Sequence, residues 1–436
     1  ILAHVPTRQL SGGDRTATHQ PLSCSLGRGL NKSLACAAAG YTNKHMGNHL
    51  PALVRKRIRV SGIVQGVGFR PFVWQRATAC GLVGWVHNTS AGVTIEIQGE
   101  QRGIAEFLNT FQSDIPPLAV INSLAIEEIP TTSELEFNIR QSLTVGEMSS
   151  PVSPDIAVCD DCLREMESPE DRRYAFPFIN CLNCGPRFTI VEDIPYDRAS
   201  TTMRSFPMCD ACLLEYHDPA SRRFHAQPNA CPECGPHVWF VREATGEHEL
   251  ASHRHSSGPL DSAAIEAFHA AIAAGQTIAV KGIGGFHLVC DATSDLALTT
   301  LRERKGRIDK PFAVMVANLN ACRKIAYLSA AEEILLESQA RPILLLRKKP
   351  ASLRATKHNL DGKPSADSPR DKADKPLSEL VAPHNDFVGI LLPYSPLHHL
   401  LLKCGRPLVM TSGNLTDEPI VRENREAQQR LSRLAD

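Results

Sequence analysis

The sequence predicts a multidomain protein in which an α+β domain and an α/β domain flank two short cysteine-rich repeats. Three observations predict this fold class. Four Cys-x-x-Cys pairs lie between Cys159 and Cys234, a β-α-β-β-α-β pattern precedes them, and apolar strands that alternate with helices follow them. The length of 436 residues suits about three domains rather than a single core.

The N-terminal segment, residues 1–54, has no sustained apolar period and contains many Ser, Thr, Gly, His and Asn residues. Such a composition predicts a disordered or extraneous segment. The chain begins with Ile1, and Met46 is a candidate for the start of translation.

Residues 55–145 are predicted to form the first domain. Strands are expected over 57–65, 82–88, 93–99, 123–129 and 136–141, and helices over 70–81 and 104–112. This order of elements is typical of the ferredoxin-like arrangement, in which two helices cover an antiparallel sheet.

A glycine-containing loop joins the first strand to the first helix of this domain. The loop residues are Gln65, Gly66, Val67, Gly68 and Phe69, and Arg70 follows them. Two glycines allow consecutive backbone N–H groups to turn inward, and the helix N-terminus adds its positive dipole. The loop is therefore a candidate anion site, where Arg70 can bind the anion through two hydrogen bonds.

Residues 155–240 contain a tandem duplication. Several Asp, Leu, Glu and Pro positions, an Arg-Arg dipeptide and a closing Cys-Gly-Pro recur 50 positions apart, together with every cysteine of the four pairs. These cysteines are Cys159, Cys162, Cys181, Cys184, Cys209, Cys212, Cys231 and Cys234.

Two Cys-x-x-Cys turns can complete a tetrahedral four-thiolate site, so the eight cysteines predict two structural zinc ions. Gly185 and Gly235 are expected to adopt positive φ in the turns after the second pairs. We expect each repeat to use its own four cysteines, while a nested pairing of the first pair with the fourth would use the same ligands. Disulfides and redox dithiols are the alternatives, and evenly duplicated pairs without a secretory signal favour zinc.

Residues 255–436 are predicted to form an α/β domain. Helices are expected over 263–275, 294–306 and 330–338, and strands over 276–282, 288–292, 311–317, 342–348 and 407–413. The alternation favours a parallel sheet. Basic residues gather where elements end, namely Lys281, Arg304, Lys305, Arg307 and Lys310. Taken singly, each is also explained as a solvated residue near a helix C-terminus.

Residues 347–376 interleave basic and acidic residues with Pro, Ser, Ala and Gly, and they lack apolar periodicity. This pattern predicts a surface loop within the third domain. An arm that binds a polyanion is the alternative interpretation.

The formal net charge is zero, which argues against electrostatic binding of nucleic acid or membranes as the main role. The sequence has no run of about 18 apolar residues and no signal peptide at its N-terminus. Six further cysteines without regular spacing suit free thiols in a reducing compartment. The expected location is the cytoplasm.

The segments GIVQGVGFR (62–70) and GLVGWVHN (81–88) resemble the acylphosphatase signature, and the likeness extends over about 90 residues of the first domain. The resemblance implies that Arg70 binds the acyl phosphate and that Asn88 orients the attacking water. Phosphoryl chemistry of this kind needs positioning and charge neutralisation more than a covalent nucleophile. A chain that ends near residue 145 is expected to keep the activity.

Four segments of the third domain resemble the YrdC-like domain, which forms carbamoyl-type adenylates from ATP. They are KGIGGFHLVCDA (281–292), LRERKGRIDKPFAVMV (301–316), GILLPYSPLHHLLL (389–402) and LVMTSGNLTDEPIV (408–421). The resemblance implies that Lys305 and Arg307 bind the triphosphate, that Lys281 lines the same pocket, and that Ser412 and Asn414 contact the nucleotide. Three phosphates need several cations, and Ser and Asn add directional hydrogen bonds.

An acylphosphatase-like domain, two zinc-finger repeats and a YrdC-like domain in this order resemble the N-terminal part of the HypF family, the carbamoyltransferases of NiFe-hydrogenase maturation. The resemblance covers residues 55–436. It implies an enzyme whose first domain hydrolyses carbamoyl phosphate to carbamate and phosphate. Its YrdC-like domain would then join carbamate to ATP, with Mg²⁺, as carbamoyl-adenylate. The zinc repeats are expected to hold the two domains together.

Members of that family continue into a sugar-kinase-like domain, which passes the carbamoyl group to the C-terminal cysteine of HypE as the precursor of the cyanide ligands. This sequence stops at Asp436, so we expect a fragment with an incomplete YrdC-like domain and weak adenylation. The alternative is a non-catalytic zinc-ribbon protein that binds RNA, since YrdC-like domains are also associated with RNA. The zero net charge argues against it.

Overall fold

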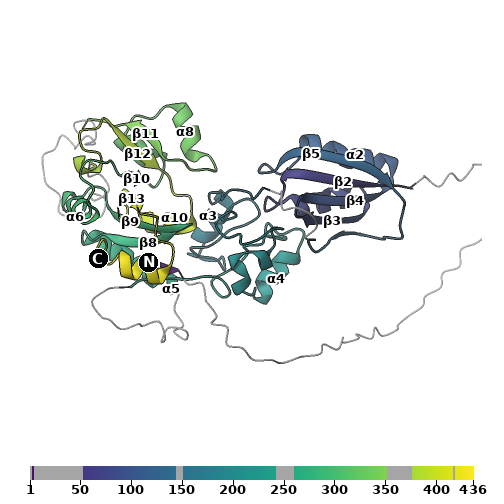
Figure 1. Ribbon diagram of the computed structural model, residues 1–436, viewed down its shortest axis with the longest axis horizontal. Helices are drawn as coiled ribbons and strands as arrows, with labels where there is room; N and C mark the ends of the chain where they lie inside the picture. Colours follow the sequence, from purple (N-terminus) through teal and green to yellow (C-terminus); the bar gives the residue numbers. More distant parts are fainter. Residues whose placement is uncertain (1, 4–52, 144–150, 242–259, 351–375, 416–417) are drawn as a thin grey trace, which may run out of the picture.

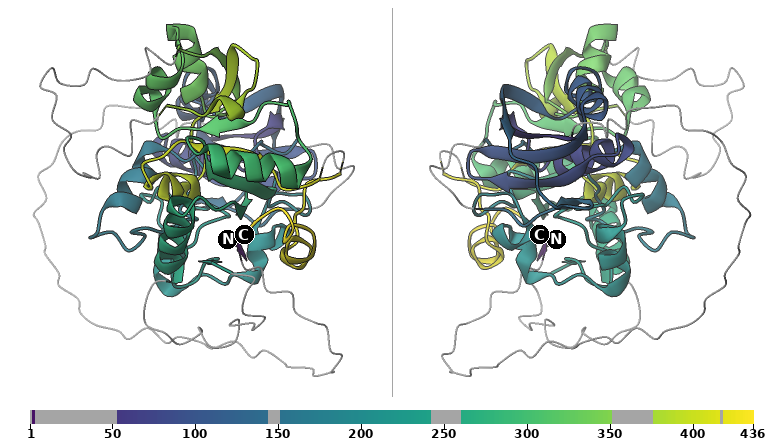
Figure 2. Two further views of the ribbon diagram at one scale, coloured as in Figure 1. Left: turned by 90° about the vertical axis from the view of Figure 1, so that its left-hand side faces the viewer. Right: turned by 90° about the vertical axis from the view of Figure 1, so that its right-hand side faces the viewer.

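The structure is a computed structural model that describes residues 2–3, 53–143, 151–241, 260–350, 376–415 and 418–436. The first domain and the third domain lie at opposite ends of the long axis, with the two cysteine repeats between them (Figure 1). Figure 2 looks along this axis from each end, and in each view one of the two domains faces the viewer with the other behind it. The described residues therefore form three units in a row, in chain order.

The first domain is a five-stranded sheet with the order β5-β2-β4-β3-β6, covered by two helices. Its elements are β2 (Leu53–Ile63), α1 (Phe69–Ala79), β3 (Val83–Thr89), β4 (Gly92–Glu100), α2 (Gln101–Ser113), β5 (Val120–Ile129) and β6 (Phe137–Ile139). Three of the four strand pairings are antiparallel, and β3 pairs with β6 in parallel. The predicted ferredoxin-like arrangement is confirmed.

The core of this domain follows from the alternation of its strands. On β2, Ile58 and Val60 are buried while Arg59 between them is exposed, because successive side chains point to opposite faces. Buried residues from the two helices, such as Val73 and Phe107, cover that apolar face. The domain thus has a hydrophobic core that is separate from those of the other two units.

The third domain contains a six-stranded sheet with the order β11-β12-β10-β13-β9-β8. Its elements are α5 (Leu260–Ala273), β8 (Ile278–Gly282), β9 (Gly285–Asp291), α6 (Asp295–Lys305), β10 (Ala313–Met315), α7 (Leu319–Ile325), α8 (Ala330–Glu337), β11 (Leu344–Arg347), a 3₁₀ turn at Glu379–Val381, β12 (Phe387–Leu391), α10 (Pro396–Leu402), β13 (Leu408–Ser412) and α11 (Asn424–Arg430). The mixed α/β class is confirmed.

The expected parallel direction of this sheet is wrong, since only β10 and β12 pair in parallel and the other four pairings are antiparallel. A tight turn explains the first departure: β8 returns directly as β9 through Gly284, whose φ is 88°. Apolar periodicity reports which face of a strand is buried and not its direction. The analysis of the sequence also missed α7, β12 and α10 as separate elements, because their apolar runs are short.

Each cysteine repeat carries one short helix, which the sequence had not predicted. The helices are α3 (Asp160–Glu167) and α4 (Asp210–His217), and each begins directly after the first cysteine of its repeat. Two 3₁₀ turns (Arg198–Ser200 and Thr202–Ser205) lie between the repeats. After the second repeat, β7 (Val238–Trp239) pairs with β1 (Leu2–Ala3). Strand β1 belongs to the N-terminal segment that was expected to be disordered.

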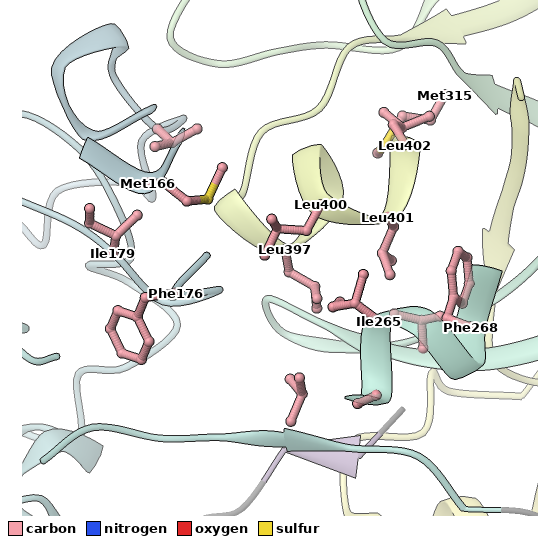
Figure 3. Close-up of a cluster of buried hydrophobic side chains, with 14 of the residues drawn as sticks. Met166, Phe176, Ile179, Ile265, Phe268, Met315, Leu397, Leu400, Leu401 and Leu402 are labelled. Carbon is pink, nitrogen blue, oxygen red and sulfur yellow. The ribbon is translucent and has the colours of Figure 1, made fainter. Parts of the chain in front are cut away.

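The first repeat and the third domain share one hydrophobic core (Figure 3). Met166 of the repeat extends toward Leu397 of α10, and Phe176 and Ile179 of the repeat belong to the same cluster. Residues of α5, including Ile265 and Phe268, complete this cluster (Figure 3). Because the cluster crosses the boundary between the two units, the first repeat and the third domain form a single packed body.

Most of the segment 1–54 and most of the loop 347–376 lie outside the described residues. Among the helices within the described ranges, none is both long and apolar enough to span a membrane.

Candidate functional site

The eight predicted cysteines lie in two clusters, each formed within one repeat. In the first cluster, adjacent sulfurs are 3.6 to 3.8 Å apart, and the second cluster has the same spacing. Four sulfurs at about 2.3 Å around a tetrahedral zinc ion would be about 3.8 Å apart. Both sites are therefore compatible with zinc, and the nested pairing is not the one adopted.

The glycines that follow the second pairs have different roles in the two repeats. Gly185 has φ of 94°, as expected. Gly235 is not in the left-handed region, so the expectation of positive φ is wrong there. A Cβ at Gly235 would lie 2.9 Å from Ala230 Cβ and from a ring carbon of Phe176, so this glycine is required by space rather than by conformation.

The duplicated Arg-Arg dipeptide links the two repeats reciprocally. Arg173 of the first repeat donates to Glu215 and to Asn229 of the second repeat, and it is buried. Arg223 of the second repeat forms the equivalent ion pair with Glu165 of the first repeat. The preceding arginine of each dipeptide also donates to cysteine sulfurs of the other repeat. Each cluster of thiolates therefore has cations from the opposite repeat beside it.

Replacing Arg223 with Met is expected to lower the free energy of unfolding by about 2–3 kcal/mol. The substitution leaves the partly buried Glu165 without its main counter-charge. Breaking a fully buried ion pair would lower the free energy of unfolding slightly more. Denaturant unfolding measures the effect. Arg164→Met is the matched control, since Arg164 is an exposed neighbour of Glu165 that, in the described part of the chain, pairs with Asp161 alone. An equal loss in the control would contradict the cross-repeat role.

The glycine loop of the first domain has the conformation that an anion site requires. Gly66 and Gly68 have φ of 72° and 76°, and Gly68 is the N-cap residue of α1. The Arg187 side chain, from the first cysteine repeat, donates through Nε to the carbonyl of Gly66. Arg187 is only 2 % exposed and gives its remaining N–H groups to carbonyls of its own repeat. The loop is thus fixed from outside its own domain.

Arg70 and Asn88 both line the cavity next to this loop. Arg70 Nη2 lies 2.8 Å from a carboxylate oxygen of Asp197, and Arg70 Nη1 lies 3.4 Å from Ser142 Oγ. Asn88 is 1 % exposed, and its Oδ1 accepts no hydrogen bond from the residues that the structure describes. A buried acceptor without a donor is costly, and a water molecule could donate to it.

The second wall of the cavity belongs to the cysteine repeats. Tyr196 N donates to Gln65 Oε1 at 2.9 Å, and Asn88 Nδ2 donates to Tyr196 O at 3.4 Å. The cavity measures about 20 Å³, enough for about one water molecule. An acyl phosphate can therefore enter only when lining side chains move. The first domain alone holds half of this site.

His225 lines the same cavity from the second repeat. Burial lowers the pKa of His225 to about 3, and the positive charge of Arg70 contributes to the lowering. The imidazole is therefore neutral over the physiological pH range. It adds polarity to the wall opposite Arg70 without adding charge.

The residues assigned to the nucleotide in the third domain are mostly brought together. Lys305 Nζ donates to the carbonyl oxygens of Ser412 and Asn414, both at 2.6 Å, and Arg307 reaches the same strand through Thr411 Oγ1 at 3.0 Å. Burial lowers the pKa of Lys305 to about 8, and the charge of Arg307 contributes. Lys305, Arg307, Ser412 and Asn414 therefore form one group at the end of β13, called here the cationic corner because it contains two positive charges.

Lys281 makes its contacts with residues other than those of that corner. Its ammonium donates to Asn424 Oδ1 at 2.9 Å and lies 5.7 Å from the centre of the Phe286 ring. Burial lowers the pKa of Lys281. Of the residues assigned to the predicted pocket, Lys281 therefore lies beside α11, and Lys305 lies at the end of α6.

One short segment of the first repeat binds the glycine loop of the first domain and lies beside the glycine turn of the third domain. Arg187 contacts Gly66, and a Cβ placed on Gly284 would lie 3.6 Å from the methyl group of Thr189. Asp155 holds the segment in place, because its Oδ1 accepts hydrogen bonds from Arg187 N, Thr189 N and Thr189 Oγ1. The two candidate sites are thereby linked through residues 187–189.

The fold and these sites define a multidomain protein that joins an acylphosphatase domain to a YrdC-like domain through a tandem four-cysteine module. Family models agree with each part. The acylphosphatase family matches residues 56–139, the HypF finger family matches 158–191 and 208–241, and a family that includes Sua5 and YrdC, described as telomere recombination, matches 270–436.

The whole chain is similar to known proteins with the same order of domains. It is 46% identical to the carbamoyltransferase HypF of Synechocystis sp. over 383 residues, which are 87% of this chain and 45% of that protein. A crystal structure of full-length HypF in a phosphate- and nucleotide-bound form is 44% identical, with a TM-score of 0.77, and the match covers 89% of this chain and 46% of that one. The chain belongs to the HypF family.

The chain spans about half the length of the curated HypF relatives it matches. The first domain by itself is 40% identical to an acylphosphatase of Oceanobacillus iheyensis, of which it covers 94%. These relatives favour the enzymatic interpretation over the non-catalytic RNA-binding one.

Three further residues of the first site, Arg187, Tyr196 and Asp197, were not predicted from the sequence. Arg187 follows a Cys-Gly-Pro, and the corresponding position of the second repeat is His237. This difference between otherwise matching repeats was a usable signal. Tyr196 and Asp197 lie between the repeats, where the duplication gives no comparison, and the sequence offered no signal for them.

Proposed function

We propose that this chain hydrolyses carbamoyl phosphate at the Arg70 site and activates the resulting carbamate with ATP at the Lys305 site. The reactions are carbamoyl phosphate plus water to carbamate plus phosphate, and carbamate plus ATP to carbamoyl-adenylate plus pyrophosphate. The observation that carries the proposal is the position of residues 187–189, where Arg187 binds the glycine loop of the first domain and Thr189 lies beside Gly284 of the third domain. Two sites linked in this way suit an intermediate that is unstable in water.

In the first step, the loop N–H groups and the Arg70 guanidinium bind the phosphoryl group and neutralise its charge. Asn88 accepts a hydrogen bond from the attacking water through its free Oδ1 and orients it toward the phosphorus atom. Carbamate leaves with the electron pair of the broken P–O bond, and the added water becomes part of the product phosphate. The buried site excludes bulk water from the carbamate.

In the second step, Lys305 and Arg307 bind the triphosphate, with Mg²⁺ accompanying the ATP. Ser412 and Asn414 orient the nucleotide, and Lys281 approaches it from α11. Zinc fills the two four-cysteine clusters and stabilises the module between the sites. We further propose that HypE accepts the carbamoyl group in the longer proteins of this family, and that the reactions take place in the cytoplasm.

The test combines two assays on the same protein. Wild type should release phosphate from carbamoyl phosphate and should exchange labelled pyrophosphate into ATP only when carbamoyl phosphate is present. Lys305→Met should lose most of the exchange while phosphate release continues. Lys403→Met is the control, because it removes an exposed positive charge in the same domain. Absence of phosphate release by the wild type would refute the first step.

The ATP affinity is expected to fall as the pH rises above about 8. In the free protein the pKa of Lys305 is lowered to about 8, so its positive charge is present below that pH and lost above it. ATP stabilises the charged form, and the affinity should therefore fall by up to about tenfold per pH unit above 8. Calorimetry between pH 7 and 9.5 measures this. In Lys305→Arg the charge persists, and a profile as steep as that of wild type would contradict the assignment.

A further inference from the structure

We propose that Asp197, which lies between the two cysteine repeats, is a positioning residue for Arg70. This inference rests on the proposed hydrolysis of an acyl phosphate at Arg70. It adds to the site a carboxylate that the first domain does not contain, and it makes the orientation of the arginine depend on the docking of the cysteine repeats.

The ion pair between these residues is short and well protected. Arg70 Nη2 lies 2.8 Å from Asp197 Oδ1, and the Arg70 side chain is 9 % exposed. Within the described residues, the other terminal nitrogen, Nη1, has a single contact, at 3.4 Å with Ser142 Oγ. Asp197 is the N-cap residue of a 3₁₀ turn, yet its side chain makes no capping hydrogen bond. Its carboxylate is therefore used for Arg70 rather than for its own turn.

The place of Asp197 distinguishes a positioning role from a blocking role. Arg70, Asn88 and the glycine loop line the cavity, whereas Asp197 is not among the lining residues in the described part of the chain. The carboxylate thus contacts the guanidinium from outside the cavity and leaves the space beside the loop open to a phosphoryl group. A carboxylate that blocked the site would have to lie within that space.

The backbone next to Asp197 is fixed to the first domain. Tyr196 donates to Gln65 and accepts from Asn88, and Gln65 in turn donates to the carbonyls of Thr89 and Gly92 at 2.7 and 2.9 Å. Asp197 is therefore presented to Arg70 from a rigid base. A guanidinium held at one nitrogen can present its remaining N–H groups to the substrate in one orientation, and a displacement of about 1 Å can cost about 100-fold in rate.

The test uses Asp197→Asn in the full chain, with zinc content and melting temperature as checks on folding. The variant should keep its zinc, and its kcat for carbamoyl phosphate should fall about tenfold or more, with a smaller change in KM. Asp193→Asn is the matched control, because Asp193 is exposed in the same segment and, among the residues that the structure describes, its carboxylate accepts only from Ile194 N. The control should retain the wild-type rate.

A double-mutant cycle separates positioning from a general structural effect. In an Arg70→Ala background, Asp197→Asn should cause no further loss, because the carboxylate acts through the arginine. A further loss of the same size would overturn the proposal, as would an unchanged kcat or a lower KM in the single variant. The lower KM would indicate a carboxylate that competes with substrate.

Failure of the inference and failure of the proposed function give different results. If Arg70→Ala hydrolyses carbamoyl phosphate at the wild-type rate, the proposed function fails. If Arg70→Ala is impaired and Asp197→Asn is not, only the inference fails. Binding of inorganic phosphate, measured by calorimetry, is a readout that needs no turnover: Asp197→Asn should bind phosphate several-fold more weakly than wild type, and equal binding would also count against the inference.

Discussion

Replacing Arg70 with Ala is expected to reduce hydrolysis of carbamoyl phosphate by about 100- to 1000-fold. The guanidinium lies in a nearly closed cavity, where charge neutralisation is stronger than in water. Its removal also leaves the Asp197 carboxylate, which contacts the guanidinium from outside the cavity, without its partner. The loss of the positive charge opposes the transition state. Release of inorganic phosphate under saturating substrate measures the loss.

Arg76→Ala is the control for this substitution. Arg76 lies on the same helix, α1, but it is exposed and pairs with Asp114 at 3.4 Å. The control should hydrolyse carbamoyl phosphate at close to the wild-type rate. Asn88→Ala should instead lower kcat with little change in KM, since it removes a group that orients water. Full phosphate release by Arg70→Ala would show that the reaction takes place elsewhere.

Replacing Cys162 with Ser is expected to abolish one metal site and to unfold the first repeat. Zinc binding to structural four-ligand sites contributes on the order of 10 kcal/mol to folding in small fingers. Cys162 is fully buried in its cluster. Water therefore cannot take the place of the thiolate ligand that the substitution removes. Metal analysis should give about half the zinc of wild type.

The loss should extend beyond the repeat. Met166 and Phe176 belong to the same hydrophobic cluster as residues of α10, so unfolding of the repeat exposes part of the core of the third domain. Limited proteolysis should then cut the third domain faster, while the separate core of the first domain should persist. Cys80→Ser is the control, because Cys80 ends α1 outside both clusters. Two zinc ions per chain in Cys162→Ser would contradict the assignment.

Local patterns in the sequence were sufficient for the first domain. The alternation in β2, the glycines of the loop and the helical period after Arg70 each report on a few neighbouring residues, and the structure places them as predicted. The spacing of the cysteines was equally informative, since four ligands of one site lie within one repeat. Such features depend on contacts that are near in sequence.

The other half of the first site could not be predicted, because it depends on contacts between distant parts of the chain. Asp197 meets Arg70 across 127 positions, and Arg187 meets Gly66 across 121. Neither contact follows from a periodic pattern or a local motif. The direction of the strands in the third domain was wrong for the same reason, since pairing partners are chosen by packing rather than by apolar periodicity.

This arrangement also changes the expectation for a chain that ends near residue 145. Such a chain would retain the glycine loop, Arg70 and Asn88, but it would lose Tyr196, Asp197 and His225 from the site. We therefore expect it to hydrolyse acyl phosphates more slowly than the full chain. Its site would be open to solvent on the side that the cysteine repeats cover.

The core shared by the first repeat and the third domain has a consequence during protein synthesis. Phe176 leaves the ribosome well before Leu397, and a separation of 221 residues (397 − 176) corresponds to roughly 10 to 45 s at typical elongation rates. During this interval the apolar side of the repeat has no partner from α10. Early metal loading would keep the repeat folded but would leave that side exposed. The nascent chain should therefore be a client for chaperones that bind apolar surfaces until α10 has been made.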